Sequence, residues 1–196
     1  MICYLIRHGK DDDSVRGGWS LSPLTDEGVR QAEELADYVE TKREQLKIEA
    51  VYSSDLPRAM QTAEPMAQRL NLAVSPMPRF REVNNGKLAG MKNDLAAELY
   101  PGMYWNCMGW EERYPDGESP KIFFDRISAA WSSFQGEITA RNENVVLVTH
   151  SGVINVILSI INHRPYSNAE KTRRIQNADI IAIEYADGEW SEVWGE

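Results

Sequence analysis

The feature that most constrains the fold of this chain is an alternation of short, continuously apolar segments with longer amphipathic segments. Continuous apolar runs, such as residues 2–6 and 145–148, are typical of strands buried on both faces of a sheet. Between such runs, apolar residues recur at helical spacing, as in residues 26–43. Strands that alternate with helices indicate an α/β fold in which most strands are parallel.

Local signals place the individual elements along the chain. The predicted strands cover residues 2–6, 50–53, 73–75, 145–148, 180–186 and 189–194, and the predicted helices cover 26–43, 57–70, 93–100, 120–140 and 153–161. Thr25, Pro57 and Ser119-Pro120 are typical of helix starts, and Asp187-Gly188 is typical of a hairpin turn. The sequence therefore predicts a three-layer αβα sandwich around a mostly parallel, mixed sheet, with residues 1–196 forming one domain.

Composition excludes several classes of partner. The net charge of −9, from 21 basic and 30 acidic residues, disfavours binding to nucleic acid or to an anionic membrane surface. Arg7 interrupts the N-terminal apolar run too early for a secretory signal, and Cys3 and Cys107 have neither the number nor the clustering for a disulfide framework or a zinc site. We expect a cytoplasmic protein without nucleic-acid or membrane partners, and a homo-oligomer stays open.

Three of the predicted strands lead to residues with phosphate-binding chemistry. The first strand ends in Arg7-His8-Gly9, the fourth leads to His150, and the second leads to Arg58 in the first turn of a helix. Because ligands of open α/β sheets bind beyond the carboxyl ends of the strands, we expect these groups on one rim. His163 follows the last helix and is expected to be an ordinary surface or cap residue.

Each residue type on this rim suits a phosphate ester. Arginine offers a planar fork of donors that matches two phosphate oxygens, and a helix that begins near Gly152 adds a favourable dipole for an anion. Histidine can act as a nucleophile at neutral pH without a metal. An Arg-His-Gly tripeptide alone is weak evidence, since a histidine at a strand end is often only a structural hydrogen bonder. The combination of these groups indicates a phosphate site.

Ordered segments along nearly the whole chain resemble the motifs of the histidine phosphatase superfamily, also called the phosphoglycerate mutase-like fold. These segments are Leu5-Ile6-Arg7-His8-Gly9, Gly18-Trp19 with residues 24–32, residues 53–63, residues 81–90, Gly117-Glu118-Ser119 and Val148-Thr149-His150-Ser151-Gly152. The resemblance implies the fold of that family and, within it, a phosphatase of the histidine acid phosphatase type that needs no metal and no cofactor. The implied partner is a small-molecule phosphomonoester.

The resemblance also implies a role for each site residue. His8 attacks phosphorus and becomes phosphohistidine, while Arg7, Arg58 and His150 bind the phosphoryl oxygens and stabilise the charge of the transition state. Glu82 protonates the leaving oxygen and then deprotonates the attacking water. The alternative for Glu82 is a solvated loop carboxylate without a catalytic role.

Three further residues are expected to bind the substrate. They are Gly9, Ser14 and Ser151. Many relatives hold the phosphoryl group with an Asn in the loop after the Arg-His-Gly motif, and Ser14 lies near the corresponding position. Ser151 and Gly9 directly follow the two histidines of the rim.

The loop after His8 departs from the family pattern, in which Glu or Gln and then Thr or Ser follow the glycine. This chain has Lys10 and then Asp11, Asp12 and Asp13. One hypothesis is that these carboxylates disfavour bisphosphates or attract a cationic group on the substrate. The other is that they form a solvated, helix-capping loop without influence on selectivity.

A second unusual feature is the aromatic segment at residues 100–110, within a stretch, residues 91–118, where the family commonly builds a cap over the site. Its aromatics, Trp105 among them, either form an apolar wall for the leaving group or pack a long loop onto the domain.

Three functions remain open. The first is hydrolysis of a small organic phosphomonoester, the second is phosphoryl transfer of the phosphoglycerate mutase type, and the third is a non-catalytic phosphate-binding module. The end of the chain soon after the hairpin, at residues 194–196, leaves no tail of the kind that closes the site of mutases, which favours water as acceptor. The presence of both histidines, both arginines and Glu82 disfavours a non-catalytic module.

Overall fold

The computed structural model describes residues 1–170 and 173–195, with side chains described up to Val193. Glu196, the last residue of the predicted C-terminal end, lies outside the described residues. The strands are β1 (Ile2–Arg7), β2 (Ile48–Ser53), β3 (Val74–Pro76), β4 (Asn144–Thr149), β5 (Ile180–Ala186) and β6 (Glu189–Gly195). The α-helices are α1 (Asp26–Thr41), α2 (Arg43–Leu46), α3 (Pro57–Leu70), α4 (Asn93–Leu99), α5 (Pro120–Arg141) and α6 (Ser151–Ile161).

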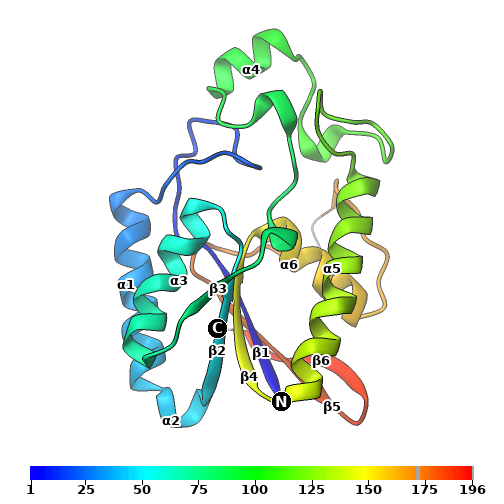
Figure 1. The fold of residues 1–196 in the computed structure, drawn as a ribbon. Coiled ribbons are helices and arrows are strands. Elements are labelled where there is room, and N and C mark those ends of the chain that lie inside the picture. Colours follow the sequence, from blue (N-terminus) through cyan, green and yellow to red (C-terminus); the bar gives the residue numbers. More distant parts are fainter. Residues whose placement is uncertain (171–172, 196) are drawn as a thin grey trace.

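The strands form one sheet in the order β3-β2-β4-β1-β5-β6 (Figure 1). β1 to β4 run parallel to one another, whereas β5 runs antiparallel to both β1 and β6. The predicted mostly parallel, mixed sheet is therefore confirmed. The hairpin at Asp187-Gly188 provides the antiparallel edge, and both of its residues have positive φ, as such tight turns require.

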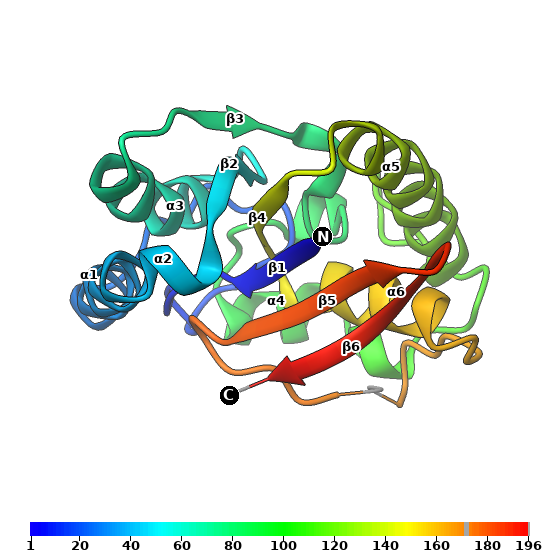
Figure 2. The ribbon, with the colours of Figure 1, turned by 90° about the horizontal axis from the view of Figure 1, so that it is seen from below.

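Helices cover both faces of the sheet, which makes three layers (Figure 2). α1 and α3 pack on one face against Tyr4 and Ile6 of β1, while α5 and α6 pack on the other against Cys3 and Leu5. Successive side chains of a strand point to opposite faces, so a strand between two helical layers must be apolar throughout. The apolar runs in the sequence are continuous because both faces of these strands are buried.

The helix starts follow the predicted capping residues. Thr25 accepts a hydrogen bond from the N–H of Gly28, and Ser119 accepts one from the N–H of Ile122. The predicted helix 26–43 ends earlier, at Thr41, and a separate helical turn follows. Val29, assigned to the apolar face, is 46% exposed, because Gly28 instead lies against the backbone of Lys10.

Residues 91–118 and the loop of residues 10–24 lie beyond the carboxyl ends of the strands, at the top of Figure 1. Backbone hydrogen bonds join the two segments: Asn93 N–H donates to the carbonyl of Ser14, and Arg16 N–H donates to that of Met91. The loop that follows His8 is thus tied to the segment that follows Glu82.

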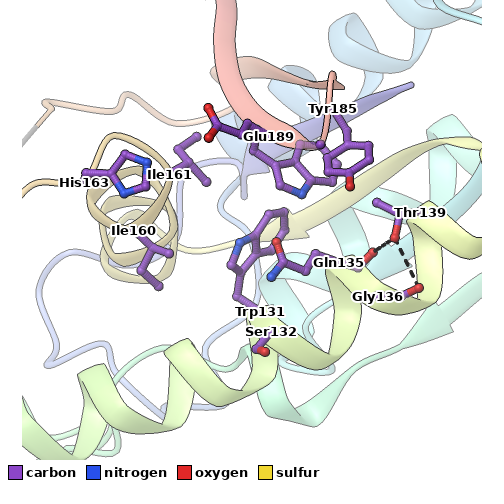
Figure 3. Close-up of a pocket in the computed structure, with 12 residues that line it drawn as sticks. Trp131, Ser132, Gln135, Gly136, Thr139, Ile160, Ile161, His163, Tyr185 and Glu189 are labelled. Carbon is purple, nitrogen blue, oxygen red and sulfur yellow. Dashed lines mark hydrogen bonds between the residues drawn. The ribbon is translucent and has the colours of Figure 1, made fainter.

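A cavity of about 380 Å³ lies between α5, α6 and the β5–β6 hairpin (Figure 3). Trp131 and Trp190 line it, together with His163, which is exposed at the end of α6. The hairpin joins the sheet beside the first residues of β1, so this cavity lies at the end of the sheet opposite to His8. His163 is therefore separate from the end of the sheet that carries His8, as expected. Within the described part of the chain, no helix is long and apolar enough to cross a membrane.

Candidate active site

The sheet brings the two histidines together because β1 and β4 are adjacent and parallel. Arg7 pairs in register with Thr149, and the N–H of His8 donates to the carbonyl of Thr149 at 3.0 Å. The rings of His8 and His150 are 5.0 Å apart between centroids. β2 lies on the other side of β4, so the first turn of α3 carries Arg58 to the same rim. The expected convergence is present.

The hydrogen bonds of His8 define which ring nitrogen carries the free lone pair. Nδ1 lies 2.7 Å from the carbonyl oxygen of Gly9, which can only accept, so Nδ1 carries the hydrogen. Nε2 accepts from Nε–H of Arg58 at 3.2 Å. Burial, with the nearby charges of Arg58 and Arg7, holds the pKa of His8 well below its usual range. His8 is therefore a neutral imidazole at pH 7 with its lone pair on Nε2.

His150 is fully buried, and its Nε2 lies 2.8 Å from the hydroxyl of Ser54. Burial, Arg58 and His8 hold its pKa well below the usual range too. Its Nδ1 has no hydrogen-bond partner among the described residues. A buried polar atom without a partner is costly, so a hydrogen bond to a ligand at Nδ1 would be favourable.

The two arginines are anchored differently. Arg58 donates through Nη2 to the carbonyl of Gly18 at 2.7 Å and through Nη1 to Ser20, so the loop after His8 fixes its guanidinium and leaves Nε facing His8. Arg7 donates through Nη1 to the carbonyl of Ile175 at 2.7 Å. Its Nε is buried and has no partner within the described residues. Each arginine is thus held by backbone carbonyls on one side.

Glu82 caps the first turn of α6. Its Oε2 accepts from the N–H of Gly152 at 3.0 Å, and its Oε1 accepts from its own neighbour, Val83 N–H, at 3.0 Å. The helix N-terminus that the sequence assigned to a bound anion therefore holds this carboxylate. A Cβ on Gly152 would collide with Oε1 of Glu82, so only glycine allows this approach.

Arg126 and Glu118 hold the Glu82 loop in place. Arg126 donates to both carboxylate oxygens of Glu118, at 2.6 and 2.9 Å, and through Nη2 to the carbonyl of Glu82 at 3.0 Å. Glu118 also accepts from the N–H of Asn84, and Trp19 Nε1–H donates to the carbonyl of Glu82. The sequence motif Gly117-Glu118-Ser119 contains Glu118, one partner of this ion pair. No sequence signal marked Arg126, because it is one charged residue on a long helix.

The three additional candidates are placed differently from one another. Gly9 already donates its N–H to Thr62 Oγ1, at 3.0 Å. Ser14 is exposed and donates its N–H to Asp12. Ser151 Oγ is buried without a hydrogen-bond partner in the described chain, as is His150 Nδ1. Of the three, only Ser151 presents an unsatisfied side-chain atom.

The three acidic residues of the loop do not share one environment. Asp12 and Asp13 are exposed, and Lys10 pairs with Glu27 at the surface. Asp11 instead points inward, with its Oδ2 3.4 Å from Nε of Arg58 and 19% of its side chain exposed. The sequence treated the three as one group, and the structure separates them.

A cavity of about 210 Å³ adjoins the rim on the side of Glu82. It is lined by Glu82, Val83, Trp105, Ser151, Gly152, Asn155, Tyr166, Ser167 and Asn168. Trp105 both lines this cavity and packs its ring against Tyr114 and Phe123. The two interpretations of the aromatic segment are thus compatible. Tyr166, from the segment after α6, was not anticipated from the sequence.

With this geometry established, comparison with known proteins identifies the class. The model of the histidine phosphatase superfamily, branch 1, matches residues 3–195. The chain therefore belongs to the histidine phosphatase superfamily.

Individual relatives carry more than one activity. A protein described as "Probable phosphoglycerate mutase GpmB" from Proteus mirabilis is 32% identical over 194 residues, which cover 95% of this chain and 86% of that protein. The solved structure of a mycobacterial glucosyl-3-phosphoglycerate phosphatase is 25% identical, with a TM-score of 0.78 over 97% of this chain and 96% of that one. The alpha-ribazole phosphatase of Shigella flexneri shares the fold, with 24% identity and a TM-score of 0.80 over 98% of this chain and 94% of that one. These relatives place the chain among phosphoryl-transfer enzymes.

Proposed function

We propose that this protein hydrolyses a small organic phosphomonoester through a phosphohistidine on His8, without a metal or cofactor. The observation that carries the proposal is the state of His8: a neutral imidazole whose Nδ1–H is held by Gly9 and whose Nε2 lone pair faces Arg58. A nucleophile needs a lone pair on the attacking atom, and Nε2 carries one. In the proposed reaction, the substrate phosphoryl group takes the place of the hydrogen bond that Nε2 accepts from Arg58 Nε–H.

The first chemical step follows from this placement. Nε2 of His8 forms a bond to phosphorus as the bond between phosphorus and the ester oxygen breaks. Glu82 supplies a proton to the departing alkoxide, a role that its position in the lining of the cavity beside the rim supports. In the second step Glu82 takes a proton from water, the water oxygen bonds to phosphorus, and the bond to His8 breaks.

Charge on the transferring group is stabilised by donors that the fold leaves unsatisfied. Arg7 Nε, His150 Nδ1 and Ser151 Oγ lack partners in the described residues, and Arg58 Nε faces the nucleophile. Phosphoryl transfer involves little covalent chemistry for the protein beyond the nucleophile, so such positioned donors supply most of the catalysis. Gly9 and Ser14 have their N–H groups engaged elsewhere, so we assign them a supporting rather than a direct role.

Residues 91–118 serve as the cap in this proposal. They lie beyond the carboxyl ends of the strands (Figure 1). They also contribute Trp105 to the cavity beside Glu82, where Tyr166 lies as well. Aromatic walls suit an organic leaving group. We also propose a cytoplasmic location, which agrees with the free thiols of Cys3 and Cys107.

Phosphoryl transfer of the phosphoglycerate mutase type is the second candidate. It is favoured by the 32% identity to a protein described as a probable phosphoglycerate mutase. The two candidates share the step on His8 and differ only in the acceptor, which is water in one and a second hydroxyl of the substrate in the other.

The test is an assay of phosphate release from a panel of phosphomonoesters, in the presence of a chelator, beside the His8→Ala variant. The panel includes 3-phosphoglycerate with a check for isomerisation. We expect release by the wild type and a loss of about three or more orders of magnitude in His8→Ala. Isomerisation without release would establish the mutase, and activity that survives in His8→Ala would refute the nucleophile.

A further inference from the structure

One N–H group of Arg58 serves both the nucleophile and a carboxylate. Its Nη1 donates twice to Ser20 and its Nη2 donates to the carbonyl of Gly18, while Nε is the donor that faces His8. Nε lies 3.2 Å from Nε2 of His8 and 3.4 Å from Oδ2 of Asp11. The Asp11 carboxylate therefore lies at the position where an anionic group bound to Arg58 beside His8 must fit.

Asp11 is held there by its surroundings. Its backbone pairs with that of Leu24, and the neighbouring Thr25 N–H donates to the carbonyl of Lys10. The charged groups that face Asp11 are Arg58 from α3, Arg7 from β1 and Asp12 from its own loop. Glu82 faces the same two arginines from the loop before η2 (Gly86–Leu88).

The charges of the site show how the position of Asp11 affects the binding of an anion. Arg58 faces the Asp11 carboxylate at 3.4 Å, while both histidines are neutral. A phosphoryl dianion would therefore enter a centre in which Arg58, the cation hydrogen-bonded to His8, is already paired with a carboxylate. The Asp11 carboxylate and a phosphoryl group bound to the same arginine would repel each other strongly in a partly buried site. A proton taken up by Asp11 removes this repulsion. Burial raises the pKa of Asp11, although Arg58 and Arg7 oppose this, so its protonation is favoured relative to an exposed carboxyl.

We propose that Asp11 is a specificity-determining residue that competes with the substrate phosphoryl group for Arg58, so that a dianion binds only with uptake of one proton by Asp11. This proposal rests on the proposed role of His8 and Arg58 as the phosphoryl site. It implies that monoanionic esters bind better than dianionic ones, and that occupancy of the site falls as pH rises. A second phosphate near the loop is disfavoured for the same reason.

The experiment is a calorimetric titration with sulfate between pH 5.5 and 8.5 at constant ionic strength. Sulfate stays a dianion over this range, so any pH dependence of its affinity comes from the protein. For the wild type we expect the dissociation constant to rise as pH rises, by up to about tenfold per pH unit for one linked proton. Asp11→Asn should bind sulfate about tenfold or more tightly at pH 7.5, with a flatter pH dependence. Asp13→Asn, a change of an exposed residue in the same loop, should match the wild type.

The outcomes that contradict the proposal are specific. Equal or weaker sulfate binding by Asp11→Asn at pH 7.5 would overturn it, and tighter binding with the wild-type pH slope would overturn the proton uptake. Asp11→Ser serves as a second variant if Asp11→Asn does not fold. Because sulfate binding requires no turnover, a wild type that binds sulfate but hydrolyses no ester would refute the proposed function while the role of Asp11 is still decided.

Discussion

At the scale of single residues, the position of Glu82, the proposed acid, depends on the lack of a side chain at Gly152. Glu82 approaches the first turn of α6 so closely that a Cβ on Gly152 would meet its Oε1. The N–H of Gly152 and the helix dipole hold the carboxylate there. Glycine at this position is therefore required by a close approach rather than by an unusual φ angle.

A Gly152→Ala change should displace the Glu82 carboxylate without unfolding the protein. We expect kcat/KM to fall by about 10²-fold, because misplacing a catalytic group by about 1 Å has effects of this size. The matched control is Gly136→Ala in α5, where a Cβ meets nothing within 4 Å. The control should keep full activity and gain about 0.5–1 kcal/mol of stability. Wild-type activity in Gly152→Ala would show that Glu82 is not the acid.

At the same scale, the sequence located His8, His150, Arg7 and Arg58 because each follows or ends a strand or begins a helix, and strand ends of a parallel sheet meet. It did not separate Asp11 from Asp12 and Asp13. Adjacent residues in a loop have no fixed periodicity, so only the fold decides which carboxylate points inward.

At the scale of elements, the loop that carries Glu82 is fixed by hydrogen bonds from a side chain that is distant in sequence. Arg126, on α5, joins the carbonyls of Arg79, Arg81 and Glu82 to the carboxylate of Glu118. A loop cannot satisfy its own carbonyls as a helix does, so a guanidinium with several donors fixes its course.

Arg126→Ala should free this loop and weaken both catalysis and stability. We expect a loss of about 3 kcal/mol from a largely buried, multiply hydrogen-bonded pair, and a kcat lower by more than tenfold at a nearly unchanged KM. Lys121→Ala on the same helix removes only an exposed pair with Asp125 and should change stability by less than about 0.5 kcal/mol. Chemical denaturation and steady-state kinetics measure both. Equal effects of the two changes would show that Arg126 does not position Glu82.

The helix and strand boundaries show where sequence patterns suffice. α3 begins at Pro57 and ends at Leu70, as predicted, because Pro suits the first turn and Asn71 adopts the left-handed cap conformation. α1 ends before the predicted Arg43, since the chain there continues into a separate turn rather than stopping at a glycine. Local sequence propensity determines that a helix forms, whereas tertiary packing determines at which residue the helix ends.

At the scale of the whole molecule, the candidate site and the aromatic packing of the hairpin lie at opposite ends of the sheet. The carboxyl ends of β1 and β4 carry the proposed reacting groups, whereas the hairpin end packs Trp131 against Trp190, with ring centroids 5.3 Å apart. Both tryptophans line the cavity between α5, α6 and the hairpin. Trp131 is labelled in Figure 3. These side chains pack the hairpin against α5.

Trp131→Ala should therefore weaken folding without altering the chemistry. Trp131 is fully buried, so its truncation should lower the free energy of unfolding by about 3–5 kcal/mol. The kcat and KM of the folded fraction should stay within about twofold of the wild type. A large change in kcat with little loss of stability would mean that the two ends of the sheet are coupled.

The most direct test of the central claim is to trap the phosphorylated enzyme. The wild type is mixed with its best ester from the panel, quenched in alkali, where phosphohistidine survives, and digested for mass spectrometry. The account predicts a phosphoryl group on His8, absent from His8→Ala and longer-lived in Glu82→Gln, because water is then deprotonated more slowly. A phosphoryl group on another residue, or turnover with none trapped in either the wild type or Glu82→Gln, would contradict the account.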